Sequence, residues 1–410
     1  MAQGTWESSM SKMATKFFLP FFFMFAVSGL PALCQSESAS DPLRTLVQRL
    51  DLEKYKASIK ALTRFGDRRQ GTERNRAAVD WIEAQLKSYG CTNTERLHYQ
   101  FDEEGVRRVV PAAVTDSAAP HFNVGGARSR GYARPTGVNT DPNAQPDATL
   151  RALDIPPAIP GLREEVYCTK IGTIHPNEMY LVSAHMDGIG FGEAANDDGS
   201  GTALVMELAR IMSSPDVQTD RSIRFILWNN EETGLNGAAA YVAQRQALQG
   251  KEMPAGSGLY PEPLWLGIVQ HDMMLFDHGM PRADGSVRSE QRAEADINIE
   301  FQANSKFAAQ SQALAWVLED ANEHYATDYP ATVGSHMTNT DSHEFQDEVA
   351  SVSMRENERG AQIGNGWDPQ WHQPTDLYAT YDDRDFRLGL NAAQTSLTAV
   401  ARLAGAIVKN

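Results

Sequence analysis

The chain has 410 residues, of which 41% are hydrophobic, and its formal net charge is −16. This length and apolar content suffice for a sizeable core, and they favour one large domain or one domain with an elaboration. The negative charge argues against nucleic acid or an anionic membrane surface as the main partner, because both repel an acidic protein.

The N-terminal segment has the pattern of a secretory signal peptide. Lys12 and Lys16 precede an apolar run, and small residues follow it near Cys34. We expect cleavage after Cys34, which removes residues 1–34 and leaves a secreted or periplasmic protein without stable membrane insertion. A lipoprotein anchored through Cys34 is an alternative, disfavoured by Leu33 where a small residue is usual. An uncleaved anchor is a further alternative.

Two cysteines remain after such cleavage, Cys91 and Cys168, and both lie in stretches typical of strands. Exported proteins often oxidise such pairs, so we favour a disulfide between them. The alternative is two buried thiols without a role.

The first half of the chain combines helices with a long insert. Apolar residues recur at spacings of three and four over residues 42–90, which predicts helices. A strand is expected at 94–101. Residues 103–163 are rich in Gly, Pro, Asn and Asp, which indicates a loop or small subdomain inserted into a single domain over 35–410.

Strands and helices alternate after Glu165. The expected strands cover 179–187, 222–228 and 264–274, and the expected helices cover 199–212, 237–248, 305–325 and 386–408. Continuous apolar strands that alternate with helices indicate an α/β fold with a largely parallel sheet, covered on both faces. Functional residues gather beyond the carboxyl ends of the strands in such sheets.

Carboxylates and histidines stand at these expected strand ends, in "SAHMDG", "ANDDGSG", "NNEETG" and "VQHDMM". The neighbouring Glu231 and Glu232 repel each other and lose hydration when buried, and a bound cation would offset that cost. Imidazole and carboxylate ligands without cysteine suit zinc in an open, hydrolytic site. Asp198 is expected to cap the following helix or to support the site rather than to bind metal, and His271 is expected to face away from Asp272 on its strand.

Together these motifs resemble those of the co-catalytic zinc exopeptidases of the bacterial leucyl-aminopeptidase type, relatives of glutamate carboxypeptidases and glutaminyl cyclases. "AHMD", "ANDDGSGTALVMELAR", "WNNEETGLNG", "HDMM" and "WHQPTD" follow the family's order, and the match covers residues 45–100 and 165–405. The resemblance implies a three-layer α/β/α sandwich with a mixed, mostly parallel central sheet.

The resemblance also implies two zinc ions per chain. It assigns their ligands: His185 and Asp272 for one ion, Glu232 and His372 for the other, and Asp197 between them. A hydroxide bridging the ions would be the nucleophile, Glu231 its general base, and Asp187 would orient His185. The chain departs from the pattern at Ser342, where a His is common, and at Trp371, where some members have a Tyr.

The leading hypothesis is an exported aminopeptidase that acts on peptides, since an acidic site suits a substrate ammonium group. The alternative is a carboxypeptidase or dipeptidase on the same scaffold, which would need a cationic pocket, with Arg355 and Arg359 as candidates. Glutaminyl cyclisation usually uses one zinc, so the second ligand set argues against it. A non-catalytic binding module would be expected to have lost ligands. The oligomeric state stays open.

Overall fold

The computed structural model describes residues 41–101, 110–111, 137–276, 297–335, 339–356 and 368–409. Its helices are α1 (Pro42–Val47), α2 (Leu52–Leu62), α3 (Glu73–Ser88), α4 (Ala148–Asp154), α5 (Gly199–Met212), α6 (Asn236–Arg245), α7 (Ala308–Tyr325) and α8 (Asp383–Leu403). Its strands are β1 (Thr94–Phe101), β2 (Val110–Pro111), β3 (Gly161–Lys170), β4 (His175–His185), β5 (Val217–Gln218), β6 (Arg221–Trp228), β7 (Leu264–His271), β8 (Ile297–Glu300), β9 (Ala331–Gly334), β10 (Ser351–Arg355) and β11 (Ile407–Val408).

Nine strands form one mixed sheet, in the order β2-β1-β3-β6-β4-β7-β10-β8-β9, and β5 pairs with β11 separately. The four central neighbours β6, β4, β7 and β10 are parallel, as are β8 and β9 at one edge. The pairs β1–β2, β1–β3, β3–β6 and β8–β10 are antiparallel. The expected α/β fold with a mixed sheet is therefore confirmed, with parallel strands at its centre.

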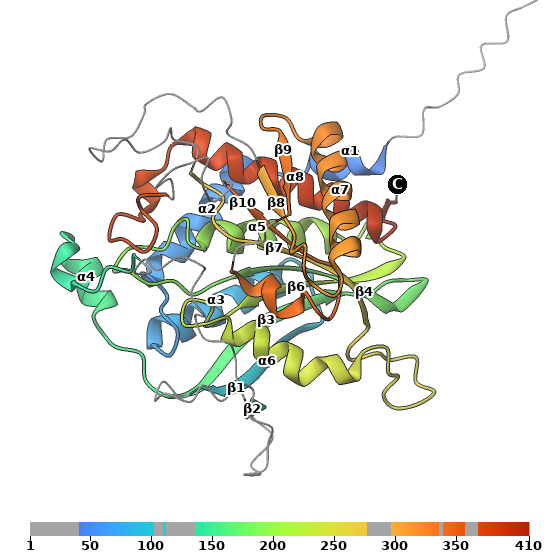
Figure 1. Ribbon diagram of the computed structural model, residues 1–410, viewed down its shortest axis with the longest axis horizontal. Helices are drawn as coiled ribbons and strands as arrows, with labels where there is room; N and C mark the ends of the chain where they lie inside the picture. The colour runs from blue at the N-terminus through green and yellow to red at the C-terminus, as the bar shows by residue number, and fades with distance from the viewer. Residues whose placement is uncertain are drawn as a thin grey trace, which may run out of the picture. The chain divides into compact units, whose positions relative to one another are not determined.

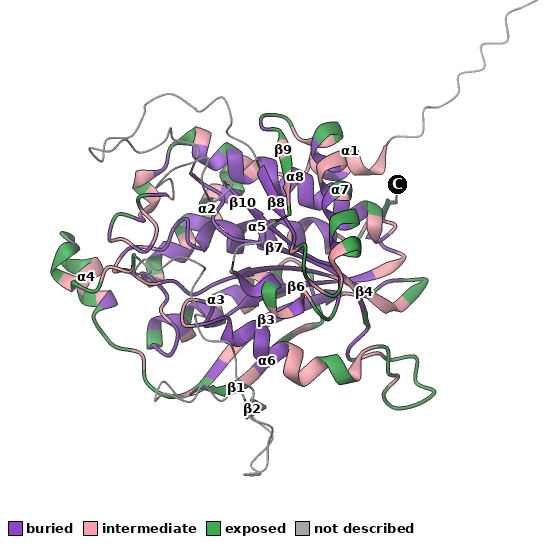
Figure 2. Cartoon of the chain, in the orientation of Figure 1, coloured by how far each residue is buried: buried purple, intermediate pink, exposed green. Residues whose placement is uncertain are grey.

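Alternate residues of the central strands face two hydrophobic cores, and these strands are largely buried (Figure 2). In β6, Phe225 and Leu227 face one core, whereas Ile226 and Trp228 face the other, as the two-residue period of a strand requires. Helices α2, α3, α5, α7 and α8 pack into the first core, and α6 packs into the second. Figure 1 shows α5 and α6 on opposite sides of the strands.

The last helix is shorter than expected. A capping box formed by Asp382 and Asp385 starts α8, but the helix ends at Leu403 and does not continue to residue 408. Gly405 has a φ of 67°, a left-handed conformation that glycine adopts readily and that ends a helix. The next residues form β11, which pairs with β5.

Several short elements were not predicted. Helix α4 and strand β2 lie within the expected insert, and β3 begins at Gly161, before that insert's expected end. Strands β8, β9 and β10 flank or follow α7, and their lengths of four or five residues are too short for a clear periodicity. The division into one domain over 35–410 with an insert at 103–163 stays a prediction.

The predicted signal peptide, residues 1–34, lies outside the described residues. Within the described ranges, no helix combines the length and the apolar character needed to cross a membrane.

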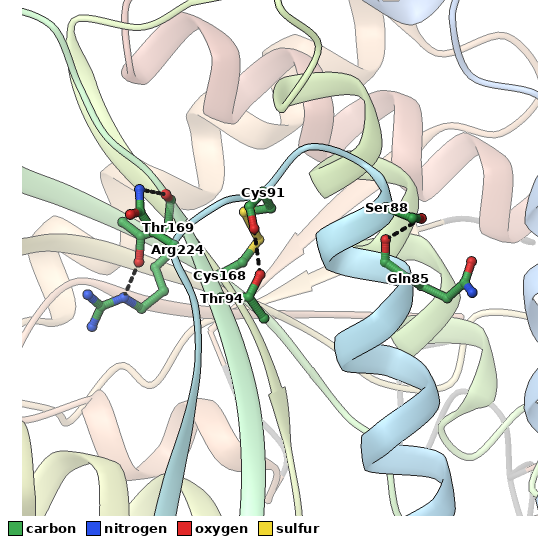
Figure 3. The surroundings of a disulfide bond; sticks show 8 residues. Gln85, Ser88, Cys91, Thr94, Cys168, Thr169 and Arg224 are labelled. Carbon is green, nitrogen blue, oxygen red and sulfur yellow. Dashed lines mark hydrogen bonds between the residues drawn. A yellow bond between two sulfur atoms is a disulfide. The ribbon is translucent and has the colours of Figure 1, made fainter.

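The predicted disulfide between Cys91 and Cys168 is confirmed (Figure 3). It joins the loop after α3 to β3 across a sequence separation of 77 residues, with the two Cα atoms 6.1 Å apart. Antiparallel pairing of Thr94 with Cys168 brings the cysteines into range, and the Thr94 hydroxyl donates to the Cys91 carbonyl at 2.6 Å. The bond therefore fastens the end of α3 to the sheet.

Candidate metal centre

The four central strands end at the same edge of the sheet, and this edge collects the predicted site residues. His185 at the end of β4 lies opposite Trp228 of β6, and Ala184 lies opposite His271 of β7. Strand β10 runs beside β7, with Met354 opposite His271. The loops after these strands therefore meet at the carboxyl edge of a parallel sheet, where function was expected.

Asp197 stands between the two predicted metal positions. Its Oδ1 lies 3.2 Å from His185 Nε2, and its Oδ2 lies 3.1 Å from His372 Nε2. His185 Nε2 is also 3.8 Å from Asp272 Oδ1, and His372 Nε2 is 2.8 Å from Glu232 Oε2. The structure thus brings the five predicted ligands together in the pairs that the sequence suggested, with one carboxylate spanning them.

The donor atoms of this cluster are suitably close for metal binding. Three overlapping groups each have their donor atoms within 4.8 Å of one another: His185–Asp197–Asp272, Asp197–Glu232–His372 and His185–Glu231–Glu232. The five predicted ligands have side chains that are at most 5% exposed. Imidazole nitrogens and carboxylate oxygens without sulfur are a set that zinc accepts in hydrolytic sites.

The electrostatics of the cluster also fit a bound cation. Burial alone would lower the pKa of His372, but Glu232 and Asp197 raise it to about 10. Burial raises the pKa of Glu232 to about 8, even though His372 lies beside it. The buried Glu232 Oε1 has no hydrogen-bond partner. Buried carboxylates that protein cations only partly neutralise are what a dication would stabilise, so these residues fit zinc.

Asp187 contacts two parts of the site in different ways. Its main-chain carbonyl lies 3.0 Å from His185 Nδ1, whereas its carboxylate is 3.9 Å from that nitrogen. The carboxylate accepts the main-chain N–H groups of Glu231 at 3.0 Å and Glu232 at 3.4 Å. The contact that orients His185 is therefore made by the backbone, and the side chain fixes the loop that carries the two glutamates.

That glutamate loop is shaped by asparagines. Asn230 has a φ of 69°, a conformation that asparagine tolerates better than most residues. Asn229 and Asn75 exchange side-chain hydrogen bonds at 2.9 and 3.0 Å, which tie the loop to the first turn of α3. The backbone after β6 is thus held in place, with Glu231 only 3% exposed.

The loop of Asp197 rests on buried acids that the sequence analysis did not assign. Asp376 accepts the main-chain N–H groups of Asn196 at 2.8 Å and Asp197 at 3.1 Å. Glu356 accepts from the Asn196 side chain at 2.8 Å. Asp198 caps α5 through Gly201 N, as expected. Asp376 is the last residue of the "WHQPTD" motif, and its place in that motif was the signal by which the sequence could have identified it.

Arg68 holds two loops of the site together through hydrogen bonds. The sequence analysis had assigned it no role. Its guanidinium is fully buried and donates to the carbonyls of Met186 at 2.7 Å and Ala194 at 2.7 Å. It donates to Glu193 as well, at 2.8 Å. Met186 lies between His185 and Asp187, so Arg68 links the end of β4 to the loop that leads to Asp197.

The loop of His372 has a constrained backbone. His372 has a φ of 58°, and its carbonyl accepts the Asn139 N–H at 3.0 Å. A Cβ on Gly190 would lie 2.3 Å from that carbonyl oxygen, so this close approach requires glycine. Trp371 stacks on the His372 ring with centroids 4.0 Å apart. Asn139, from within the predicted insert, therefore contacts the backbone of a candidate ligand.

Other residues considered from sequence have different surroundings. His271 lies away from the cluster, with Nδ1 3.0 Å from the Ser183 carbonyl and Nε2 2.6 Å from the Ser396 hydroxyl. Arg355 is buried and pairs with Asp272 at 2.6 Å, and Arg359 lies outside the described residues. Asp341 is fully buried and accepts from Gln270 at 3.2 Å.

Comparisons with known proteins indicate a peptidase family. The sequence model of peptidase family M28 matches residues 167–393. Aminopeptidase YwaD from Bacillus subtilis (strain 168) is 47% identical over 68 residues, which are 17% of this chain and 14% of that protein. Carboxypeptidase Q from Mus musculus is 34% identical over 92 residues, or 22% and 20% of the two chains.

A solved structure shares the fold. BSAP, a zinc aminopeptidase from Bacillus subtilis, has a TM-score of 0.57 at 15% identity, and the alignment covers 88% of this chain and 96% of that chain. The matched segments of the two curated relatives span only a fifth or less of their lengths, whereas the structural match extends over most of both chains.

Proposed function

Because the chain belongs to peptidase family M28, we propose that it is a di-zinc aminopeptidase that removes N-terminal residues from peptides. The observation that carries this proposal is Asp197, whose two oxygens face His185 and His372 within 3.2 Å. A carboxylate in this position suits two ions that share one ligand. The family assignment and the neighbouring zinc aminopeptidase support a metallo-exopeptidase, and the N-terminal direction is the finer part of the proposal.

The chain's own residues divide into ligands and a base. His185 and Asp272 would hold one zinc, Glu232 and His372 the other, and Asp197 both. Bound zinc would polarise the peptide carbonyl and lower the pKa of an attacking water. Glu231, beside the ligands, would take the proton of that water and pass it to the leaving amine. Asp187 would hold Glu231 in place through the main-chain N–H that it accepts.

The direction of cleavage is the main alternative. The similarity to carboxypeptidase Q favours a carboxypeptidase or dipeptidase as the second candidate. Such an enzyme needs a cation for the substrate carboxylate. Arg355 is 1% exposed and already paired with Asp272, so it is poorly placed for that task. The surplus of buried carboxylates around Glu231 suits a substrate ammonium better.

Peptides with blocked ends test the direction. One peptide is incubated with the zinc-loaded protein in three forms: free, acetylated at the N-terminus and amidated at the C-terminus. We expect the amidated peptide to lose N-terminal residues and the acetylated one to survive, as read by mass spectrometry. The opposite pattern would leave the metal site intact and replace the aminopeptidase with a carboxypeptidase.

We also propose that the protein is exported as a mature chain from residue 35. The disulfide between Cys91 and Cys168 supports an oxidising compartment, where such bonds persist. N-terminal sequencing of the secreted or periplasmic protein tests this, and a chain that begins before residue 35 would contradict it.

A further inference from the structure

Arg355 is a buried cation that touches one side of the metal centre. It ends β10, and the Asp272 N–H donates to the neighbouring Met354 carbonyl at 3.2 Å, which sets the two residues side by side. Arg355 is 1% exposed, and its Nη2 lies 2.6 Å from Asp272 Oδ2 and 3.4 Å from the Asn339 carbonyl. Glu300 Oε2 lies 3.8 Å from Arg355 Nε.

The two outer carboxylate ligands therefore have different surroundings. Asp272 divides its oxygens between His185 and the guanidinium of Arg355. Glu232 directs Oε2 toward His372, and its buried Oε1 has no hydrogen-bond partner. Among the ion pairs of the described residues, Glu232 has none with a lysine or arginine. The outer carboxylate of one predicted zinc position thus has a permanent positive charge beside it, whereas Glu232 has no such partner among the described residues.

We propose that Arg355 is a positioning residue that makes the two zinc positions unequal, lowering the zinc affinity at the His185–Asp272 position. An arginine stays charged at all ordinary pH values, so it repels a dication on the same carboxylate and withdraws charge from that ligand. The Glu232–His372 position is then the tighter one. This inference rests on the proposed function, because it requires two zinc ions per chain.

The test measures zinc affinity rather than activity. Zinc is titrated into the metal-free protein in competition with a chromogenic chelator, which yields a dissociation constant for each ion. Arg355→Gln keeps hydrogen-bond donors near Asp272 but removes the charge. We expect it to tighten the weaker constant about tenfold, the size expected for a dication and a unit charge about 5 Å apart even at high dielectric. Asp272→Asn alters a predicted ligand of the His185–Asp272 position. It should abolish the weaker zinc binding, which would assign the weaker constant to that position.

Two controls separate charge from packing. Arg355→Lys keeps the charge and should keep both constants. Arg224 is a matched buried arginine, 2% exposed and paired with Glu262 at 2.5 Å, and Arg224→Gln should also leave both constants unchanged. If Arg355→Gln does not fold, Glu300→Gln tests the same charge effect, and the expected change in zinc affinity has the opposite sign. It removes a negative charge from beside Arg355 and should weaken the looser zinc further.

Different outcomes would overturn this inference alone or the proposed function as well. Two zinc ions in the wild type and in the arginine variants, with an unchanged or weaker second constant in Arg355→Gln, would overturn this inference and leave the proposed function standing. An unchanged second constant in Glu300→Gln would overturn it in the same way. Fewer than two zinc ions in the wild type and in all variants would overturn the proposed function and this inference together.

Discussion

At the scale of single residues, the adjacent Glu231 and Glu232 have different surroundings although they are chemically alike. Glu232 lies 2.8 Å from His372 and has a side chain that is 1% exposed, which suits a ligand. Glu231 is held through its main-chain N–H by Asp187 and lies beside His185 and Glu232. One donor atom from each glutamate lies within 4.8 Å of the other and of His185, so a metal ligand and a proton acceptor can stand side by side.

Replacing Glu231 by Gln should abolish most turnover and keep the zinc. The amide has nearly the shape of the carboxylate but cannot accept a proton, and loss of a general base typically costs roughly 100-fold or more in rate. Metal analysis and kcat on a peptide substrate check this. Glu232→Gln is the matched comparison and should lose zinc. A Glu231→Gln enzyme with near-normal kcat would remove Glu231 from the role of base.

A second prediction concerns Asp154, at the end of α4. Burial, with Asp67 beside it, raises the pKa of Asp154 to about 8. An unfolded Asp has a pKa of about 3.9, so the native chain keeps a proton that the unfolded chain loses between these values. The stabilisation from protonated Asp154 is complete below about pH 4 and is lost as the pH rises toward about 8.

Asp154→Asn should remove this part of the pH dependence. Its Oδ1 can still accept the Asp67 N–H, which lies 3.1 Å from the present carboxylate. Urea unfolding at about pH 5 and about pH 9 should show a smaller fall in unfolding free energy for the variant than for the wild type. The exposed Asp141→Asn serves as control, and parallel curves for wild type and Asp154→Asn would contradict the prediction.

At the scale of elements, the disulfide joins structure near the start of the chain to a strand after the insert. Cys91 follows α3, and Cys168 lies in β3 at the level of Phe225, three residues before the end of β6. It constrains the unfolded chain more than it shapes the metal centre, which lies beyond the strand ends.

Replacing both cysteines by serine should therefore lower the free energy of unfolding by about 2–4 kcal/mol and leave kcat nearly unchanged. Urea titration and peptide turnover under native conditions measure the two quantities. Adding a reductant should reproduce the stability loss in the wild type and have no effect on the double variant. A large loss of kcat in the folded variant would show that the bond also positions the site.

At the scale of the whole molecule, the metal centre joins distant parts of the chain. Its predicted ligands come from β4, from the loops after β6 and β7, from the loop before α5 and from the loop before α8. An ion held by all of them would stabilise the folded chain, because the unfolded chain cannot present these ligands together.

Zinc removal by a chelator should accordingly abolish activity and lower the thermal midpoint. Zinc at about 100 times its dissociation constant should add about 2.7 kcal/mol to the unfolding free energy for each site. Differential scanning calorimetry across a zinc series checks this, and magnesium, which prefers all-oxygen octahedral sites, should not substitute. A midpoint that does not respond to zinc would count against a metal centre that spans these elements.

Much of the fold and site could be predicted from the sequence because the signals are local. Long apolar segments identified β4, β6, β7 and most helices, and each ligand type stands directly at a strand end or in a motif. Short elements such as β8 and α4 were missed because four to seven residues carry too little periodicity. The predicted end of α8 at residue 408 was wrong, because Gly405 was not recognised as the residue that stops the helix.

The sequence by itself determined the α/β class through the alternation of its elements, and the family through its resemblance to known zinc exopeptidases. The ligand set was predicted from that same resemblance. Only the tertiary structure decided which groups support the ligands. Asp376 reaches Asp197, and Arg355 reaches Asp272, across 179 and 83 residues of chain. Such partners meet only when the sheet aligns its strand ends, because the contacts depend on strand order, which local spacing does not encode.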